Sequence, residues 1–370
     1  MTTHVNCTPF STLVFETLDH RDREYHVAVI RATCDLTDGG ELRPAAAQTP
    51  VAAADQYFGE PTLSGLRWES DLAPYKPRCD ILLEATAYAP KGTPAPGWPV
   101  DIRVGTHRKR LLVTGPRRWQ RKLFGGWKTP LPEPIANLPL RYDYAYGGQV
   151  TRYDPESERE HTDHCPHNPL GVGYWPPWAH QEAKRRDQIP IPQLLAVEDV
   201  QPEFGRPLRV QGVGPTGKTW LPRIDLAGTY DEPWQAGRWP KLPEDFDFGF
   251  WNCAHPDLRI PYPAGDEKIE LYNLTPRVGS NPGCLAIGLW CWCVTGTARS
   301  RRHVPTWIPC SSHPTTGALA WSGGPPSWPS RRCGYWNHTC LPSRGPESRR
   351  SEDPPWRIKK VHVSRANSSS

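Results

Sequence analysis

The chain has 370 residues, of which 44 are proline, with a net charge of +5, which is room for one large or two ordinary domains. This much proline disfavours long helices, because proline removes a backbone donor and clashes with the preceding turn. No stretch reaches the roughly 18 consecutive apolar residues of a membrane span, and the start of the chain has no secretory signal pattern. A cytoplasmic protein is expected, with its 11 cysteines as free thiols.

Several segments are predicted to be strands. Residues 25–35 (YHVAVIRATCD) contain a β-branched run, and residues 80–88 (DILLEATAY) resemble it. Residues 100–115 alternate apolar and polar side chains on both sides of a turn, which predicts a hairpin. Residues 267–274 (EKIELYNL) alternate again. The best short helix is residues 179–188 (AHQEAKRRDQ), which lie between prolines.

These short strands predict a mainly β protein with sandwich-like or barrel-like structure and little helix. Long loops rich in proline, tryptophan and tyrosine connect the strands. The predicted organisation is a β-rich domain over residues 1–276, as one or two lobes, followed by an irregular tail over residues 277–370.

The tail differs sharply in composition from the rest of the chain. Residues 1–276 contain 31 Lys and Arg against 36 Asp and Glu, whereas residues 277–370 contain 13 against 3. The basic balance thus belongs to the tail and gives no reason to expect nucleic-acid binding by the domain. The tail mixes Trp, Cys, Pro, Ser, Gly and Arg without a strand or helix period. A frameshift in a G/C-rich gene would produce this mixture, and an unusual native basic tail is the alternative.

Residues 212–219 (GVGPTGKT) fit the phosphate-loop pattern literally. Such a loop cradles phosphates with backbone N–H groups at the start of a helix. The sequence allows a short strand over residues 208–211 before this loop, but Pro222 and Gly228 disfavour the helix that must follow it. We therefore interpret the segment as a proline- and glycine-containing loop, with nucleotide binding as the alternative.

A cluster of potential metal ligands lies at His161, His164, Cys165 and His167. Zinc is bound by such side chains in a tetrahedron, but this spacing matches no standard structural site. Cys253 and His255 would complete a site only through the fold. The preferred interpretation is a polar loop without metal.

Two further groups have a functional and a structural interpretation. The acid pairs Asp245/Asp247 and Asp266/Glu267 suit general acid–base chemistry, but turns are favoured because Asp is a turn residue. Loop tryptophans can stack on sugars, yet in β-rich proteins they more often fill cores and corners. These tryptophans are Trp175, Trp178, Trp220, Trp234, Trp239 and Trp251.

A series of segments, in the same order, resembles one bacterial protein family. They are residues 70–77 (SDLAPYKP), 115–119 (GPRRW), 138–148 (LPLRYDYAYGG), 168–174 (NPLGVGY), 220–223 (WLPR), 227–231 (AGTYD), 242–247 (LPEDFD) and 265–274 (GDEKIELYNL). Together they look like an uncharacterised domain family encoded beside type VI secretion genes. The resemblance covers residues 6–276, and the family's β-rich sequence is expected to continue where the tail begins.

The resemblance implies a non-enzymatic adaptor or chaperone. Its partners would be a toxic effector or a PAAR-like tip protein, loaded onto a VgrG-type spike, with no cofactor, nucleic acid or membrane involved. Candidate contact or shape residues come from the shared motifs, although Tyr and Trp also fill β cores. They are Arg141, Tyr142, Tyr144, Tyr146, Trp220, Arg223, Tyr230 and Asp231. The alternatives are a carbohydrate-binding module, which requires coplanar exposed rings, and a metal-dependent hydrolase built on the histidine cluster.

Overall fold

The computed structural model describes residues 6, 8–36, 42–61, 63–154, 156, 158–183, 188–263, 267–274 and 286–290. Within them the chain is mainly strand, and its α-helices are limited to α1 (His180–Ala183) and α2 (Glu232–Gly237). Short 3-10 turns supply the other helical residues. They are η1 (Pro90–Gly92), η2 (Tyr142–Tyr144), η3 (Pro177–Ala179), η4 (Ile224–Leu226), η5 (Phe248–Trp251) and η6 (Pro256–Leu258). Of the helix predicted over residues 179–188, His180–Ala183 are described as α1, and residues 184–187 lie outside the described part.

The predicted hairpin forms the middle of the largest described sheet, whose order is β18–β10–β9–β20. β9 (Gly97–Val104) and β10 (His107–Thr114) pair antiparallel. β20 (Ile269–Tyr272), also predicted, pairs with β9, and β18 (Leu194–Leu195) pairs with β10. The alternation therefore works as expected, because every second side chain of a strand faces the same core.

A second sheet is built around β7 (Cys79–Glu84), which lies between β19 (Arg259–Ile260) and β21 (Ala286–Trp290). The predicted strand over residues 80–88 is thus interrupted, and it resumes as β8 (Thr86–Tyr88), paired with β13 (Asn137–Pro139). Side chains of β7, β9, β10 and β20 share one hydrophobic cluster. This cluster is the centre of the described molecule.

The remaining described sheets have two strands each. They pair β1 (Ser11–Leu18) with β2 (Glu24–Arg31), β3 (Cys34–Leu36) with β4 (Leu42–Pro44), β5 (Gln56–Tyr57) with β6 (Leu66–Trp68), β11 (Gln120–Arg121) with β12 (Trp127–Lys128), β14 (Tyr146–Gly147) with β17 (Val172–Gly173), and β15 (Gln149–Asp154) with β16 (Arg159–His164). The strand predicted over residues 25–35 is interrupted, and it forms β2 and β3, which belong to different sheets. The mainly β class is confirmed, and the described sheets are small, with none closed on itself.

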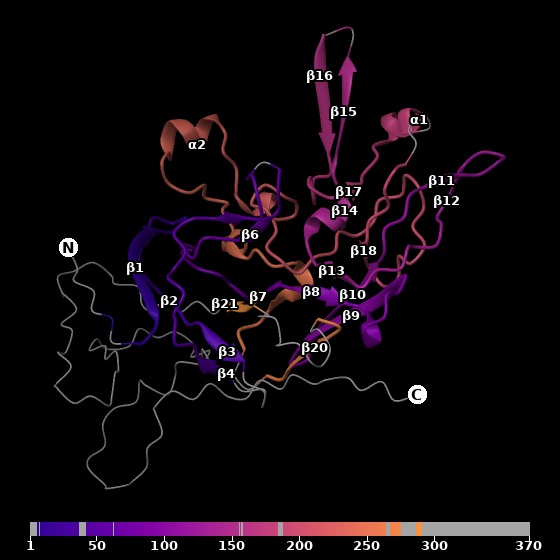
Figure 1. Ribbon diagram of the computed structural model, residues 1–370. Helices are drawn as coiled ribbons and strands as arrows, with labels where there is room; N and C mark the ends of the chain where they lie inside the picture. The colour runs from indigo at the N-terminus through magenta and orange to yellow at the C-terminus, as the bar shows by residue number, and fades with distance from the viewer. Residues whose placement is uncertain are drawn as a thin grey trace, which may run out of the picture.

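Long loops carry several elements away from the two larger sheets. Figure 1 shows α2 and the β15–β16 hairpin projecting on one side, while the β11–β12 hairpin projects at one end. In the described residues, no helix has the length and apolar character needed to cross a membrane. The projecting elements hold much of the exposed aromatic surface, so they define where a functional surface is to be sought.

Candidate functional site

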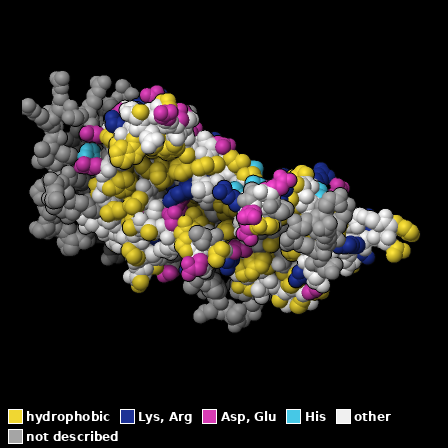
Figure 2. Space-filling view, turned by 90° about the horizontal axis from the view of Figure 1, so that it is seen from above, with side chains coloured by type: hydrophobic (Ala, Val, Ile, Leu, Met, Phe, Trp, Pro, Cys, Tyr) yellow, Lys and Arg dark blue, Asp and Glu magenta, His cyan; other side chains and the backbone are white. Residues whose placement is uncertain are grey.

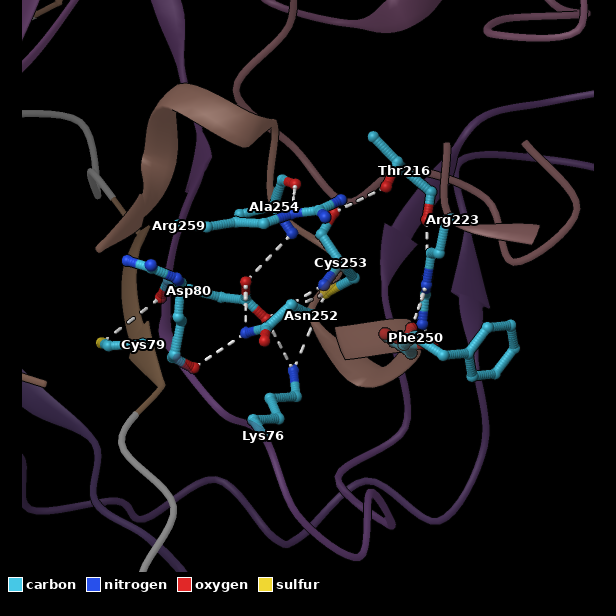
Figure 3. A network of polar contacts seen from close by, with 12 residues as sticks. Lys76, Cys79, Asp80, Thr216, Arg223, Phe250, Asn252, Cys253, Ala254 and Arg259 are labelled. Carbon is cyan, nitrogen blue, oxygen red and sulfur yellow. Dashed lines mark hydrogen bonds and ion pairs between the residues drawn. The ribbon is translucent and has the colours of Figure 1, made fainter. Parts of the chain in front are cut away.

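A buried lysine and aspartate join two loops that are far apart in the sequence. Lys76 Nζ lies 2.9 Å from Asp80 Oδ2, and the two side chains are 4% and 0% exposed. The backbone N–H of Cys253 donates to Asp80 Oδ2 at 3.0 Å, and the Asn252 amide donates to Asp80 Oδ1 at 3.0 Å. Figure 3 shows these groups converging on Asp80. The start of β7 is thereby tied to the chain around residue 253.

The charged groups of this cluster are paired with each other and hydrogen-bonded. Burial alone would raise the pKa of Asp80, but the Lys76 ammonium and the bonds from Cys253 and Asn252 hold it below its usual value. Burial also opposes charge on Lys76, yet the Asp80 carboxylate leaves the pKa of Lys76 raised. Burial raises the pKa of the Cys253 thiol well above normal, which makes it a poor nucleophile. The arrangement fits a structural tie.

A pocket of about 470 Å³ lies beside this cluster, and its lining includes Arg78, Asp247 and Arg259. Neither Lys76 nor Asp80 nor Cys253 is among the residues that line it. The paired charges thus do not line this pocket, although Asn252, which bonds Asp80, does.

Arg223, one of the predicted contact residues, is fully buried. Its guanidinium donates to Glu69 Oε1 at 2.5 Å and to the carbonyls of Phe250 at 2.6 Å and Thr216 at 2.8 Å. Phe250 also places its ring 5.2 Å from the guanidinium carbon. Arg223 therefore organises the interior rather than a contact surface, because every direction it points is occupied by this chain.

The predicted residues of the segment 138–148 also support the interior. Tyr142 and Trp220 are 4% and 5% exposed, and their rings meet edge to face at 5.2 Å. Tyr146 is buried, which raises its pKa to about 12, and Tyr144 packs against the main core. Arg141 is 32% exposed, pairs with Asp143 at 3.1 Å, and lies over the Phe58 ring. Of this group, only Arg141 and Tyr144 are partly exposed, and Tyr144 is packed against the core.

Two predicted residues lie at the surface on the α2 segment. Asp231 caps α2 by accepting a hydrogen bond from the Trp234 backbone N–H at 2.9 Å, which satisfies one of the free donors at the helix start. Tyr230 is 53% exposed, and its ring meets that of Trp234 at 4.7 Å and 73°. Trp239 lies on the same segment and is 66% exposed, and its backbone N–H donates to the Trp234 carbonyl. We call Tyr230, Trp234 and Trp239 the aromatic patch.

Hydrogen bonds within the chain hold the segment that carries the patch. Trp234 Nε1 donates to the Lys241 carbonyl at 2.9 Å, and Arg238 donates to the carbonyls of Leu242 and His20. Figure 2 shows hydrophobic side chains gathered over the end of the molecule where α2 lies. Fixed aromatic rings that remain exposed are typical of protein contact surfaces.

A second cluster pairs the buried Lys109 and the largely buried His255 with Asp257, whose side chain is 58% exposed. Lys109 Nζ contacts Gln211 Oε1 at 3.0 Å, His255 Nδ1 at 3.1 Å and Asp257 Oδ2 at 3.2 Å. Burial lowers the pKa of Lys109 to about 8 and, together with the Lys109 charge, that of His255 to about 4. The Lys109 side chain is 0% exposed, so this amine is not presented to a substrate.

The phosphate-loop match lacks the structure that phosphate binding requires. Residues 208–211 form no strand, and residues 221–223 form turns that lead into η4 rather than an α-helix. Lys218 Nζ lies 2.9 Å from Asp55 Oδ2 and 3.5 Å from Glu69 Oε1. The expected loop conformation is confirmed, and the lysine is paired with acids of its own chain.

The histidine cluster lies on and after β16. His161 is 58% exposed and pairs with Asp163 at 3.3 Å, and Cys165 is buried. Cys253 and His255 belong to the two clusters above and not to this hairpin. In the part of the chain that the structure describes, no three His, Cys, Asp or Glu side chains are grouped to hold a metal.

The remaining candidates have structural roles. Asp245 accepts hydrogen bonds from the backbone and hydroxyl of Thr229, and Asp247 caps η5. The turn interpretation of this pair is confirmed, while Asp266 lies outside the described residues. The tryptophans divide between interior and surface: Trp220 is buried, Trp175 and Trp251 pack against small clusters, and Trp239 is exposed.

Comparison with known proteins gives one result. The family described as "Uncharacterized protein conserved in bacteria (DUF2169)" matches residues 21–308, more than half of the chain. The chain belongs to this family. No curated protein and no solved structure matches it.

The DUF2169 match runs past Pro276, where the tail was expected to begin. In that stretch β21 pairs antiparallel with β7, from Ala286 opposite Glu84 to Trp290 opposite Asp80. This part of the expected tail therefore contributes a strand to the second sheet. The boundary at residue 276 and the frameshift origin of the tail stay predictions, and the rest of the tail lies outside the described residues.

Sequence reasoning missed the groups that hold the loops together. Lys76 and Asp80 lie only four residues apart, but no local signal shows that the pair is buried, because Asp80 is also held by the distant Cys253. The partners of Lys109 all lie on other segments. The exposed position of Leu123 and Phe124, at 92% and 97%, was missed as well. A leucine and a phenylalanine before two glycines in a basic segment are the signal that would have revealed it.

Proposed function

We propose that the chain is a non-enzymatic adaptor that binds a type VI secretion effector or a PAAR-like tip protein in the cytoplasm and helps to load it onto a VgrG-type spike. The mechanism is stoichiometric binding, with no bond made or broken. The resemblance of its motifs to adaptors of this kind supplies the identity of the partners. The observation that carries the proposal is the aromatic patch, in which Tyr230 and Trp239 are exposed and Trp234 is half-buried and bonded to its own chain.

The buried ion pairs and hydrogen bonds elsewhere in the described chain are consistent with a binding protein. Arg223, Lys76 and Lys109 are all held by groups of the same chain, so the most strongly interacting charges serve the fold. These ties hold long loops in one conformation, which lowers the entropic cost of association. A pre-organised loop surface suits an adaptor better than a reaction centre, which needs a reactive group open to a substrate.

The arrangement of the patch favours protein over sugar. A sugar-binding platform was expected to show coplanar exposed rings, whereas Tyr230 and Trp234 meet at 73°. The same segment carries the exposed acidic and basic residues Asp231, Glu232 and Lys241. Aromatic residues bordered by polar groups match the anatomy of a protein interface.

The test uses the full chain and the effector and PAAR-like proteins encoded beside its gene. Each purified candidate is titrated against the chain, and at least one is expected to bind. Trp239→Ala should weaken that binding by about tenfold or more, as for an interface hot spot. Tyr153→Ala is the matched control, because Tyr153 is 62% exposed on the β15–β16 hairpin. A well-folded chain that binds none of the candidates would contradict the proposal.

A further inference from the structure

The β11–β12 hairpin, which we call the finger (residues 120–128), carries the most exposed apolar pair among the described residues. Leu123 is 92% exposed and Phe124 is 97% exposed. The Gly125 N–H donates to the Lys122 carbonyl at 3.1 Å, so Leu123 and Phe124 occupy the two central positions of a turn. Turn centres favour small and polar residues, and the fold gains nothing from this pair.

The base of the finger is anchored, so the tip is presented in a defined place. Trp127 stacks on Phe204 at 4.6 Å, and Trp119 meets the same ring edge to face at 5.5 Å. Thr129 Oγ1 donates to the Pro202 carbonyl at 2.9 Å. Gly125 and Gly126 adopt φ of +90° and +82°, a backbone that other residues rarely take. The glycines and the anchored base thus give the turn a defined backbone conformation.

The finger is uniformly basic. Residues 117–132 contain five Lys and Arg and no Asp or Glu. Of these five, Arg118, Arg121, Lys122 and Lys128 are exposed. Figure 1 places the finger and α2 at opposite ends of the molecule. In Figure 2 the finger end carries hydrophobic side chains at its extremity and Lys and Arg next to them.

We propose that the finger is a second docking element, whose Leu123 and Phe124 insert into an apolar pocket bordered by carboxylates on a protein partner. The apolar pair requires a pocket that excludes water, and the adjacent cations require acidic groups around it. This inference rests on the adaptor function proposed above. It adds a contact at the opposite end from the aromatic patch, so that one chain can hold two components of an assembly at once.

The test titrates the full chain with the same purified effector, PAAR-like and spike proteins. The double variant Leu123→Ser/Phe124→Ser should weaken binding to one of them by about tenfold or more. Lys122→Glu should weaken it too, and this effect should shrink between about 0.1 M and about 1 M salt, because screening shortens from roughly 10 Å to roughly 3 Å. Leu63→Ser is the control, since Leu63 is 75% exposed on another loop. Equal melting temperatures would show that the variants fold.

The outcomes separate the two proposals. Binding that Trp239→Ala weakens and the finger variants leave unchanged would overturn the finger proposal alone. Absence of any binding would overturn both. Binding of the chain to vesicles of phosphatidylcholine and phosphatidylserine in equal parts, lost in the double variant, would assign the finger to a lipid surface instead. Self-association in sedimentation that the same variant abolishes would assign it to a second copy.

Discussion

Lys109 Nζ and His255 Nδ1 lie 3.1 Å apart in a buried cluster, which fixes the proton positions of the imidazole. The ammonium of Lys109 has only donors, so Nδ1 must accept. The Asp257 N–H also donates to Nδ1 at 3.2 Å. The proton of the neutral ring therefore lies on Nε2, which donates to the Val210 carbonyl at 3.1 Å. Protonation of His255 would place a hydrogen against the ammonium.

The first prediction is a loss of stability in mild acid that depends on His255. Burial and Lys109 lower its pKa from 6.5 to about 4. Between these values the unfolded chain takes up a proton that the folded chain does not. The contribution of His255 is thus fully present above about pH 6.5 and is lost as the pH falls toward 4, by about 3 kcal/mol.

Urea unfolding between about pH 7 and about pH 4.5 measures this loss. His255→Gln should flatten the dependence, because the amide can accept from Lys109 and donate to Val210 without titrating. His161→Gln is the control, because His161 is 58% exposed. Identical pH dependence in the original chain and in His255→Gln would contradict the assignment.

The second prediction concerns Arg223 and Glu69. Arg223→Ala leaves the Glu69 carboxylate, 6% exposed, without its closest cation and frees two buried carbonyls. Removing one partner of a buried pair costs about 3–5 kcal/mol. Arg206→Ala should cost less than about 1 kcal/mol, because its pair with Glu203 is 71% and 75% exposed. Urea unfolding of both variants measures these losses. Equal losses of stability would show that burial does not determine how much an ion pair contributes to the free energy of unfolding.

The third prediction concerns the phosphate-loop match. Lys218 is paired with Asp55 and Glu69, and no helix follows it to direct N–H groups at a phosphate. Isothermal titration with ATP and GTP should show no binding by the original chain. Lys218→Ala should leave partner binding unchanged and cost about 1 kcal/mol of stability or less, as for a half-exposed ion pair. Nucleotide binding that disappears in this variant would overturn the interpretation.

The parts of the fold that follow local rules were predictable. Alternation predicted β9, β10 and β20, because one face of each strand must meet the core. The roles of the motif residues were less accessible. Tyr230 and Arg223 come from neighbouring motifs, yet one is 53% exposed and the other is buried.

Whether a motif residue is buried or exposed depends on partners that are distant in the sequence. Glu69 lies 154 residues from Arg223, and Asp80 lies 173 residues from Cys253. Composition and period carry no signal of such pairs. The aromatic character of the candidate surface was therefore predictable, while its position on the α2 segment was not.

The last prediction concerns the end of the chain. β21 pairs with β7 over five residues, from Asp80 to Glu84. A chain ending at Leu274 loses this pairing and leaves an edge of β7 open beside Ile81 and Leu83, which are 2% and 3% exposed. With each hydrogen bond worth about 0.5–1.5 kcal/mol, the loss should exceed about 2 kcal/mol and promote aggregation through the open edge.

A chain ending at residue 308 retains β21 and the whole DUF2169 match. Residues 309–370 have no strand or helix period, so their removal should leave the melting temperature within about 2 °C, which corresponds to about 1 kcal/mol in a chain of this size. Thermal unfolding followed by circular dichroism on the full chain and both truncations decides between the two boundaries. Equal stability of the two truncations would place the end of the domain near residue 276, as composition alone predicts. A large loss on ending the chain at residue 308 would instead show that the segment beyond it packs as part of the domain, and the frameshift hypothesis would then fail.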